Sequence, residues 1–151
     1  MPEQSYQHAA TTPADVGAVW AALNQPVTWE AIPGVDRVVD PIVDASGRLD
    51  GFSFESSVGG KRYLGRATPA LRDEGKRIGW DISTPEIKGR VVVGLVPEGG
   101  GTKVDVRLDV AGVGMLGNLF FPVIASAIGG GFAETVEEFV NGFDSHRGTS
   151  P

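Results

Sequence analysis

Three side chains have the chemistry for acid–base catalysis or for binding a polar group. Tyr63 carries a phenol that can donate a proton to a carbonyl, and His8 carries an imidazole that can make acid–base contacts. Arg37 falls in an alternating set that is otherwise apolar, with Val35 and Val39. Either a bulge turns Arg37 outward, or its guanidinium enters the interior and selects an anionic or carbonyl-bearing ligand. We take Tyr63, His8 and Arg37 as the candidate catalytic residues.

Metal and thiol chemistry find little support in the sequence. The chain has no Cys and only two His, which argues against a thiolate nucleophile, a disulfide framework and a multi-His zinc site. Asp36, Asp40 and Asp44 are spaced four apart and would suit a hard cation, but a solvated strand face explains them better. No G-x-S-x-G motif is present. We expect no metal ligands.

The segment 112–117 matches the G-x-G-x-x-G pattern of dinucleotide-binding loops. It follows a predicted strand and begins a predicted helix, and Glu137 and Glu138 lie about 20 residues further on, as that fingerprint asks. Dinucleotide binding also needs a second parallel strand after the helix, and only eight residues follow Phe143. We therefore expect no nicotinamide or flavin cofactor and interpret the segment as a strand-to-helix turn.

Composition and charge limit the classes of partner. The 151 residues, 15.8 kDa, suffice for one domain, and the net charge of -6 with dispersed bases argues against nucleic acids and anionic lipid surfaces. No signal peptide is evident, and the most apolar stretch, Met115–Ile128, is shorter than the roughly 20 residues that span a bilayer. We expect a cytoplasmic protein without stable membrane insertion, a monomer or weak homodimer.

The N-terminal quarter predicts one strand and two helices. Thr12 suits a helix N-cap and Pro13 the first helical position, and apolar residues then recur at helical spacing to Leu23. A short second helix is expected over 26–32, ending at Pro33-Gly34. Trp20 should be buried against the sheet, whereas Trp29 should border the mouth of a cavity.

Turn residues recur about every dozen positions between 35 and 110, which predicts a meander of antiparallel hairpins. Each segment alternates between apolar and charged side chains, so one sheet face is covered and the other is wet. Alternation places Leu71 on the apolar face and Arg72 on the charged one. The expected strands are Ser5–Thr11, Val35–Val43, Phe52–Ser57, Lys61–Arg72, Arg77–Thr84, Ile87–Val96 and Thr102–Val110.

An apolar stripe at helical spacing predicts one long helix over 116–143, with Gly129–Gly131 inside it as either a close-packing site or a hinge. The remaining residues, 145–151, look like a flexible tail, which leaves a single domain over 1–144. The fold class is therefore α+β, with a curved seven-stranded antiparallel sheet wrapped around a long C-terminal helix and two short helices after the first strand. A sheet that curls around one helix tends to leave a cavity.

The chain resembles the Bet v 1/START-like (SRPBCC) superfamily, whose fold is the helix-grip fold. The resemblance covers about Tyr6 to Phe143 and is closest to the bacterial polyketide cyclase/dehydrase-type branch. Four stretches carry it: Thr12 to Asn24, Pro26 to Trp29, Ile32-Pro-Gly-Val35, and Tyr63 to Trp80. Ile32-Pro-Gly-Val35 is also similar to the branch of accessory proteins associated with CO-dehydrogenase.

Three functions remain open from the sequence. The first is binding of a hydrophobic small molecule, such as a lipid, a polyketide-like aromatic or an isoprenoid, between the sheet and the segment 119–127. The others are an enzyme of the cyclase/aromatase/dehydratase type without metal or nucleotide cofactor, and an accessory protein resembling the CO-dehydrogenase-associated branch. The expected ligand-binding residues are Trp29, Phe52, Phe54, Tyr63, Trp80, Val93, Leu108, Phe120, Val123, Ile124 and Ala127.

Overall fold

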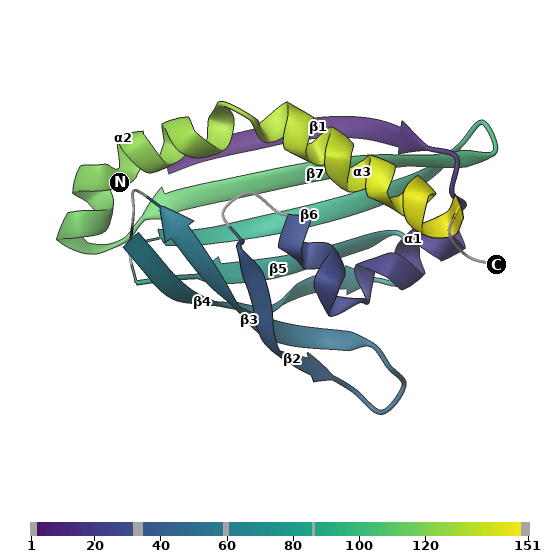
Figure 1. The fold of residues 1–151 in the computed structure, drawn as a ribbon, viewed down its shortest axis with the longest axis horizontal. Coiled ribbons are helices and arrows are strands. Elements are labelled where there is room, and N and C mark those ends of the chain that lie inside the picture. The colour runs from purple at the N-terminus through teal and green to yellow at the C-terminus, as the bar shows by residue number, and fades with distance from the viewer. Residues whose placement is uncertain (1–2, 32–34, 59–60, 86, 149–151) are drawn as a thin grey trace.

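The computed structural model describes residues 3–31, 35–58, 61–85 and 87–148. Seven antiparallel strands form one curved sheet in the order β1-β7-β6-β5-β4-β3-β2, as the alternation predicts (Figure 1). The strands are β1 Glu3–Thr12, β2 Arg37–Val43, β3 Leu49–Val58, β4 Lys61–Asp73, β5 Arg77–Ser83, β6 Ile87–Glu98 and β7 Gly101–Gly112. Strands β2 to β7 form a continuous meander. The last of them, β7, pairs with β1, which forms the edge opposite β2.

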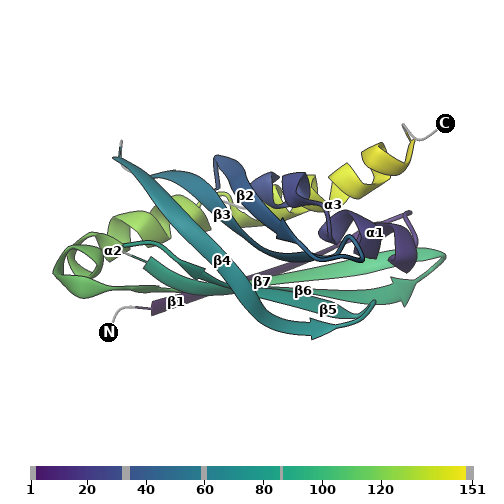
Figure 2. The same cartoon turned by 90° about the horizontal axis from the view of Figure 1, so that it is seen from below.

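The helices follow the expected order along the chain, with different bounds. They are α1 Val16–Leu23, the 3-10 helix η1 Pro26–Ala31, α2 Gly114–Gly129 and α3 Phe132–Gly148. The predicted end of the second helix, at 32–34, lies outside the described residues. Figures 1 and 2 show α2 and α3 following one another along the β1 and β7 side of the sheet, with α1 beside the far end of α3. No helix in the described part of the chain is long and apolar enough to cross a membrane.

The first helix begins later than predicted, because Thr12 still belongs to the sheet. Thr12 pairs with Thr102 at the end of β1, so it cannot be the N-cap. Asp15 takes that role: its Oδ1 accepts a hydrogen bond of 2.7 Å from the backbone N–H of Ala18, and Val16 begins the helix.

The single long helix predicted at the C-terminus is two helices. Gly130 and Gly131 separate α2 from α3, consistent with the poor helix propensity of glycine. Gly129 also permits a close approach to the sheet, since a Cβ there would lie 2.8 Å from Cε1 of Tyr6. Helix α3 continues to Gly148, past Ser145, where the sequence predicted the start of a flexible tail.

A bulge in β4 reverses the alternation that the sequence shows. Pro69 pairs with Trp80, but the register shifts at Ala70, and Arg72 then pairs with Ile78. Ile78 is buried on the concave face, so Arg72 faces the helices and Leu71 the outside, the opposite of the prediction. The guanidinium of Arg72 donates to Oδ1 of Asn24 at 3.0 Å, at the end of α1.

Strand β2 also differs from the predicted alternation. Val38 pairs with Phe54, which is buried, so Val38 faces inward and Arg37 outward. The register shifts again between Val39 and Ile42, and Asp40 has a φ of 47°.

Candidate ligand-binding site

The concave face of the sheet carries a dense group of rings at the end near α1. We call it the aromatic cluster; it consists of Trp29, Phe52, Phe54, Trp80, Phe139 and Phe143. The rings of Trp29 and Trp80 lie 5.8 Å apart in an edge arrangement, and the ring of Phe139 lies 6.1 Å from Trp29. Its members are at most 5% exposed, so the cluster belongs to the buried core.

Trp29 is at the centre of this cluster, and the prediction that it borders a cavity mouth was wrong. Its side chain is 1% exposed, and its Nε1 donates a hydrogen bond of 2.9 Å to the backbone carbonyl of Leu23. The tight 3-10 turn of η1 directs the indole inward. Trp20, expected to be buried, is instead half-buried, with the guanidinium of Arg72 5.9 Å from its ring centre.

The other end of the concave face, nearest α2, is less tightly covered. We call it the α2 end of the sheet and define it by inward-facing Tyr6, Tyr63, Ile82, Ile87, Leu108 and Val110. The first four of these are half-buried, whereas the inward-facing residues further along the same strands, such as Ile78 and Val93, are at most 1% exposed. Apolar coverage of the sheet therefore decreases toward α2.

A few polar groups lie among the apolar side chains of the α2 end. Tyr6 donates a hydrogen bond of 2.7 Å from its phenol to the backbone carbonyl of Ala125 on α2, and burial raises the pKa of Tyr6. Tyr63 pairs across the strands with Ser56, whose side chain is buried. Tyr6 was not among the predicted site residues, although it lies two positions from the candidate His8 and therefore on the same face of a strand.

The three candidate catalytic residues do not meet. His8 faces α3, where its Nε2 lies 3.7 Å from Oε2 of Glu137, while Tyr63 is on β4, four strand spacings or about 19 Å away along the sheet. Arg37 is on the outer surface, 63% exposed, and pairs with Glu55 at 2.8 Å. Arg37 therefore does not enter the interior, which corrects that alternative of the sequence analysis.

The remaining predicted ligand-binding residues divide into two groups. Val93 and Leu108 lie buried on the concave face, on β6 and β7. Phe120, Val123, Ile124 and Ala127 belong to α2, but their side chains lie outside the described residues. The predicted cavity between α2 and the sheet remains a prediction.

Two further features bear on cofactors and metals. The glycine segment 112–117 joins β7 to α2, which leads to α3, so the described part of the chain supplies no parallel strand after this turn. Among the residues the structure describes, no three His, Asp or Glu side chains gather as metal ligands do.

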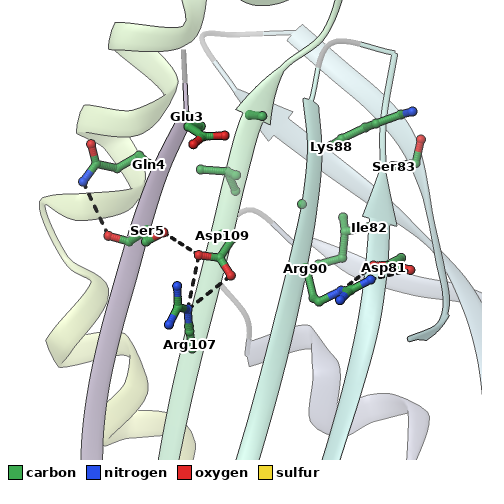
Figure 3. Close-up of a pocket in the computed structure, with 13 residues that line it drawn as sticks. Glu3, Gln4, Ser5, Asp81, Ile82, Ser83, Lys88, Arg90, Arg107 and Asp109 are labelled. Atoms are coloured by element: carbon green, nitrogen blue, oxygen red, sulfur yellow. Dashed lines mark hydrogen bonds and ion pairs between the residues drawn. The ribbon is translucent and has the colours of Figure 1, made fainter. Parts of the chain in front are cut away.

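A groove of about 630 Å³ lies on the outer face of the sheet, and its lining includes Ile82 and Val110 of the α2 end (Figure 3). Arg90 pairs there with Asp81 at 2.8 Å, which raises the pKa of Arg90, and Arg107 pairs with Asp109 at 3.2 Å. Because both guanidinium groups already have carboxylate partners on neighbouring positions, the concave face is the better candidate for a ligand site.

Comparison with known proteins gives the family. The family model described as polyketide cyclase/dehydrase and lipid transport matches residues 3–143. No curated protein sequence matches the chain.

Among solved structures, a START superfamily protein from Mycobacterium smegmatis matches with a TM-score of 0.70 at 14% identity, covering 94% of this chain and 97% of that one. The ZhuI aromatase/cyclase from Streptomyces sp. R1128 also has a TM-score of 0.70, at 12% identity, with 96% and 93% covered. Ara h 8.0201 matches at 0.63 and 16%, with 96% and 97% covered. The chain belongs to the polyketide cyclase/dehydrase and lipid transport family and has the helix-grip fold of the START/Bet v 1 superfamily.

Proposed function

We propose that this protein binds a hydrophobic small molecule, such as a lipid, a polyketide-like aromatic or an isoprenoid, between α2 and the concave face of the sheet. The observation that carries the proposal is the uneven burial of that face. Ile78 and Val93 are fully buried further along their strands, whereas Tyr6, Ile82 and Ile87 are half-buried at the α2 end. Half-buried apolar side chains on an inward face are the surface that an apolar ligand would cover.

The chemistry of the α2 end fits such a ligand. Its walls are aliphatic, and its polar groups are few: the phenols of Tyr6 and Tyr63 and the hydroxyl of Ser56. Binding sites for small molecules commonly combine apolar walls with a small number of placed polar groups. The description of the family, which includes lipid transport, supports the same class of ligand.

Titration with the neutral dye N-phenyl-1-naphthylamine tests this proposal. We expect saturable binding to the wild-type protein and displacement by a fatty acid, a fused-ring aromatic ketone or farnesol. Ile82→Trp adds bulk on the inward face of the α2 end and should weaken dye binding at least tenfold with an unchanged circular dichroism spectrum. Leu64→Trp is the matched control, because Leu64 is 65% exposed on the outer face of the sheet.

Two results would refute the proposal. One is the lack of saturable dye binding by the folded protein. The other is an equal change in dye affinity for Ile82→Trp and Leu64→Trp. That result would mean that the dye binds non-specifically at the surface and not at the α2 end.

The second candidate is a cyclase, aromatase or dehydratase, favoured by the family description and by the likeness of fold to an aromatase/cyclase. The separation of His8 from Tyr63 across four strand spacings favours the binding protein over acid–base catalysis by these two groups. Mass spectrometry after incubation with an aromatic poly-ketone distinguishes the two candidates. A binding protein returns the compound unchanged, and a dehydratase or aromatase releases it with one water fewer. A cyclase that only closes the ring releases an isomer of the same mass, which chromatography before the mass measurement separates.

A further inference from the structure

We infer that the indole N–H of Trp80 donates a hydrogen bond to a neutral oxygen of the bound ligand, such as a ketone, ester or ether oxygen. This inference rests on the proposed function and narrows the class of ligand. Trp80 lies on β5, the middle strand of the sheet, and faces the concave side two positions from Ile82, which belongs to the α2 end. Its side chain is 1% exposed, and its Nε1 has no hydrogen-bond acceptor in the part of the chain that the structure describes.

The neighbouring indole shows that the fold can satisfy such a donor. Trp29 is equally buried, 5.8 Å from Trp80, and its Nε1 reaches the carbonyl of Leu23 at 2.9 Å. Nearly all buried donors in folded proteins have a partner, because a donor that leaves water without finding one costs free energy. One of two adjacent indoles is therefore satisfied by the chain itself, and the other calls for a different acceptor.

A ligand oxygen suits this position better than a buried water. The ring of Phe52 lies 5.4 Å from Trp80, and the cross-strand neighbours are Pro69 and Val91. These surroundings are apolar, whereas a buried water typically makes two to four hydrogen bonds. A ketone or ester oxygen is held by carbon on its other side and needs only the one donor.

The charge of the acceptor follows from the same surroundings. A carboxylate or phosphate in this place would need further donors or a cation. Among the described residues, the neighbours Trp29, Phe52 and Val91 offer neither. Arg72, on the same side of the sheet, already donates to Asn24 and to the carbonyl of Leu49. Trp80 thus selects a neutral oxygen placed in an otherwise apolar molecule.

The structure also contains the main competing explanation. The rings of Trp80 and Phe52 meet at 69°, an edge arrangement in which the N–H could point at the face of a neighbouring ring. Such contacts are weak, and they would remain unchanged when a ligand binds. An experiment that compares the free and ligand-bound protein therefore separates the two explanations.

The first experiment uses fluorene and 9-fluorenone, which have nearly the same shape and differ in one carbonyl group. Affinities are measured by displacement of N-phenyl-1-naphthylamine from the wild type and from Trp80→Phe, which keeps an aromatic ring and removes the donor. We expect Trp80→Phe to weaken fluorenone binding about three- to tenfold relative to fluorene, the range of one net hydrogen bond. Trp29→Phe is the matched control and should leave the ratio of the two affinities unchanged.

The second experiment uses only the wild-type protein, so its result does not depend on whether a variant folds. In the wild-type protein labelled with ¹⁵N at the indoles of its three Trp residues, fluorenone should move the Trp80 N–H signal downfield while fluorene does not. The Trp29 signal, whose proton is held by Leu23, should respond equally to both probes.

The outcomes separate this inference from the proposed function. If both probes bind but Trp80→Phe preserves the fluorenone-to-fluorene ratio, or the Trp80 signal stays in place with fluorenone, the inference is wrong and the binding function stands. If the folded protein binds neither probe but still binds N-phenyl-1-naphthylamine, the inference is wrong and the binding function stands; if it does not bind the dye either, both fail.

Discussion

The phenol of Tyr6 on β1 donates a hydrogen bond of 2.7 Å to the backbone carbonyl of Ala125 on α2, joining residues 119 positions apart. The ring of Tyr6 also lies 5.5 Å from that of Phe132, the first residue of α3, and against Gly129. One side chain on the edge strand therefore contacts both helices on either side of the glycine break.

Replacing Tyr6 by Phe should loosen α2 more than α3. The variant keeps the ring but loses the hydrogen bond to Ala125, so we expect the free energy of unfolding to fall by about 0.5–1.5 kcal/mol. Urea denaturation measures that change, and amide hydrogen exchange locates it. Faster exchange confined to Gly114–Gly129 is expected, and a uniform change across both helices would contradict the assignment.

The same phenol predicts a dependence on alkaline pH. Burial raises the pKa of Tyr6 above its ordinary value of 10.0, so the folded state holds this proton more tightly than the unfolded state. Its contribution is therefore complete below pH 10 and is lost as the pH rises through the higher folded pKa. The stability difference between wild type and Tyr6→Phe should shrink above pH 10. Urea midpoints from pH 8 to 11 test this, and a constant difference would disprove it.

Trp29→Ala should destabilise the protein far more than Trp20→Ala. Trp29 packs against Phe52, Trp80 and Phe139 and is 1% exposed, so its loss should cost about 3–5 kcal/mol. Trp20 is half-buried, and its loss should cost about 1–2 kcal/mol. Paired urea melts measure both values. Similar values would mean that the aromatic cluster rearranges to fill the space left by the Trp29 side chain.

Gly65 should not tolerate a side chain. A Cβ at this position would lie 2.3 Å from Cζ of Phe54, whose ring is buried in the aromatic cluster. We expect Gly65→Ala to cost about 1–3 kcal/mol through overpacking. Gly94→Ala is the control, because its Cβ would make only an ordinary contact, 3.7 Å from Cγ of Arg77. Thermal melts in which both variants behave alike would count against this packing.

The sheet was predictable because each strand is separated from the next by turn residues and shows a period of two. The errors fall where that period breaks. At Ala70 one extra residue in β4 turns Arg72 inward. The neighbouring Pro69, which has no N–H for the strand ladder, was the local sign of this bulge. The split between α2 and α3 did carry a signal, the run Gly129–Gly131, but glycines in a helix can equally reflect close packing.

The candidate site was less predictable than the fold. The sequence placed Phe52, Phe54 and Trp80 on the inward face, where the structure has them. Whether an inward aromatic is packed solid or borders a ligand depends on what lies opposite, and for Trp29 that is set by contacts with residues distant in sequence, such as Phe139. Hydrogen-bond satisfaction, which distinguishes Trp80 from Trp29, is likewise a three-dimensional property.

Strand β2 gives the sheet an edge that discourages growth from one molecule to the next. Pro41 has no backbone N–H to offer, and the left-handed Asp40 beside it interrupts the regular register with β3. A strand from another molecule needs an unbroken row of donors and acceptors, and this edge lacks one although Ile42 and Val43 leave it apolar. The kink thus protects a hydrophobic, seven-stranded sheet against fibrillar assembly at β2 in concentrated solution.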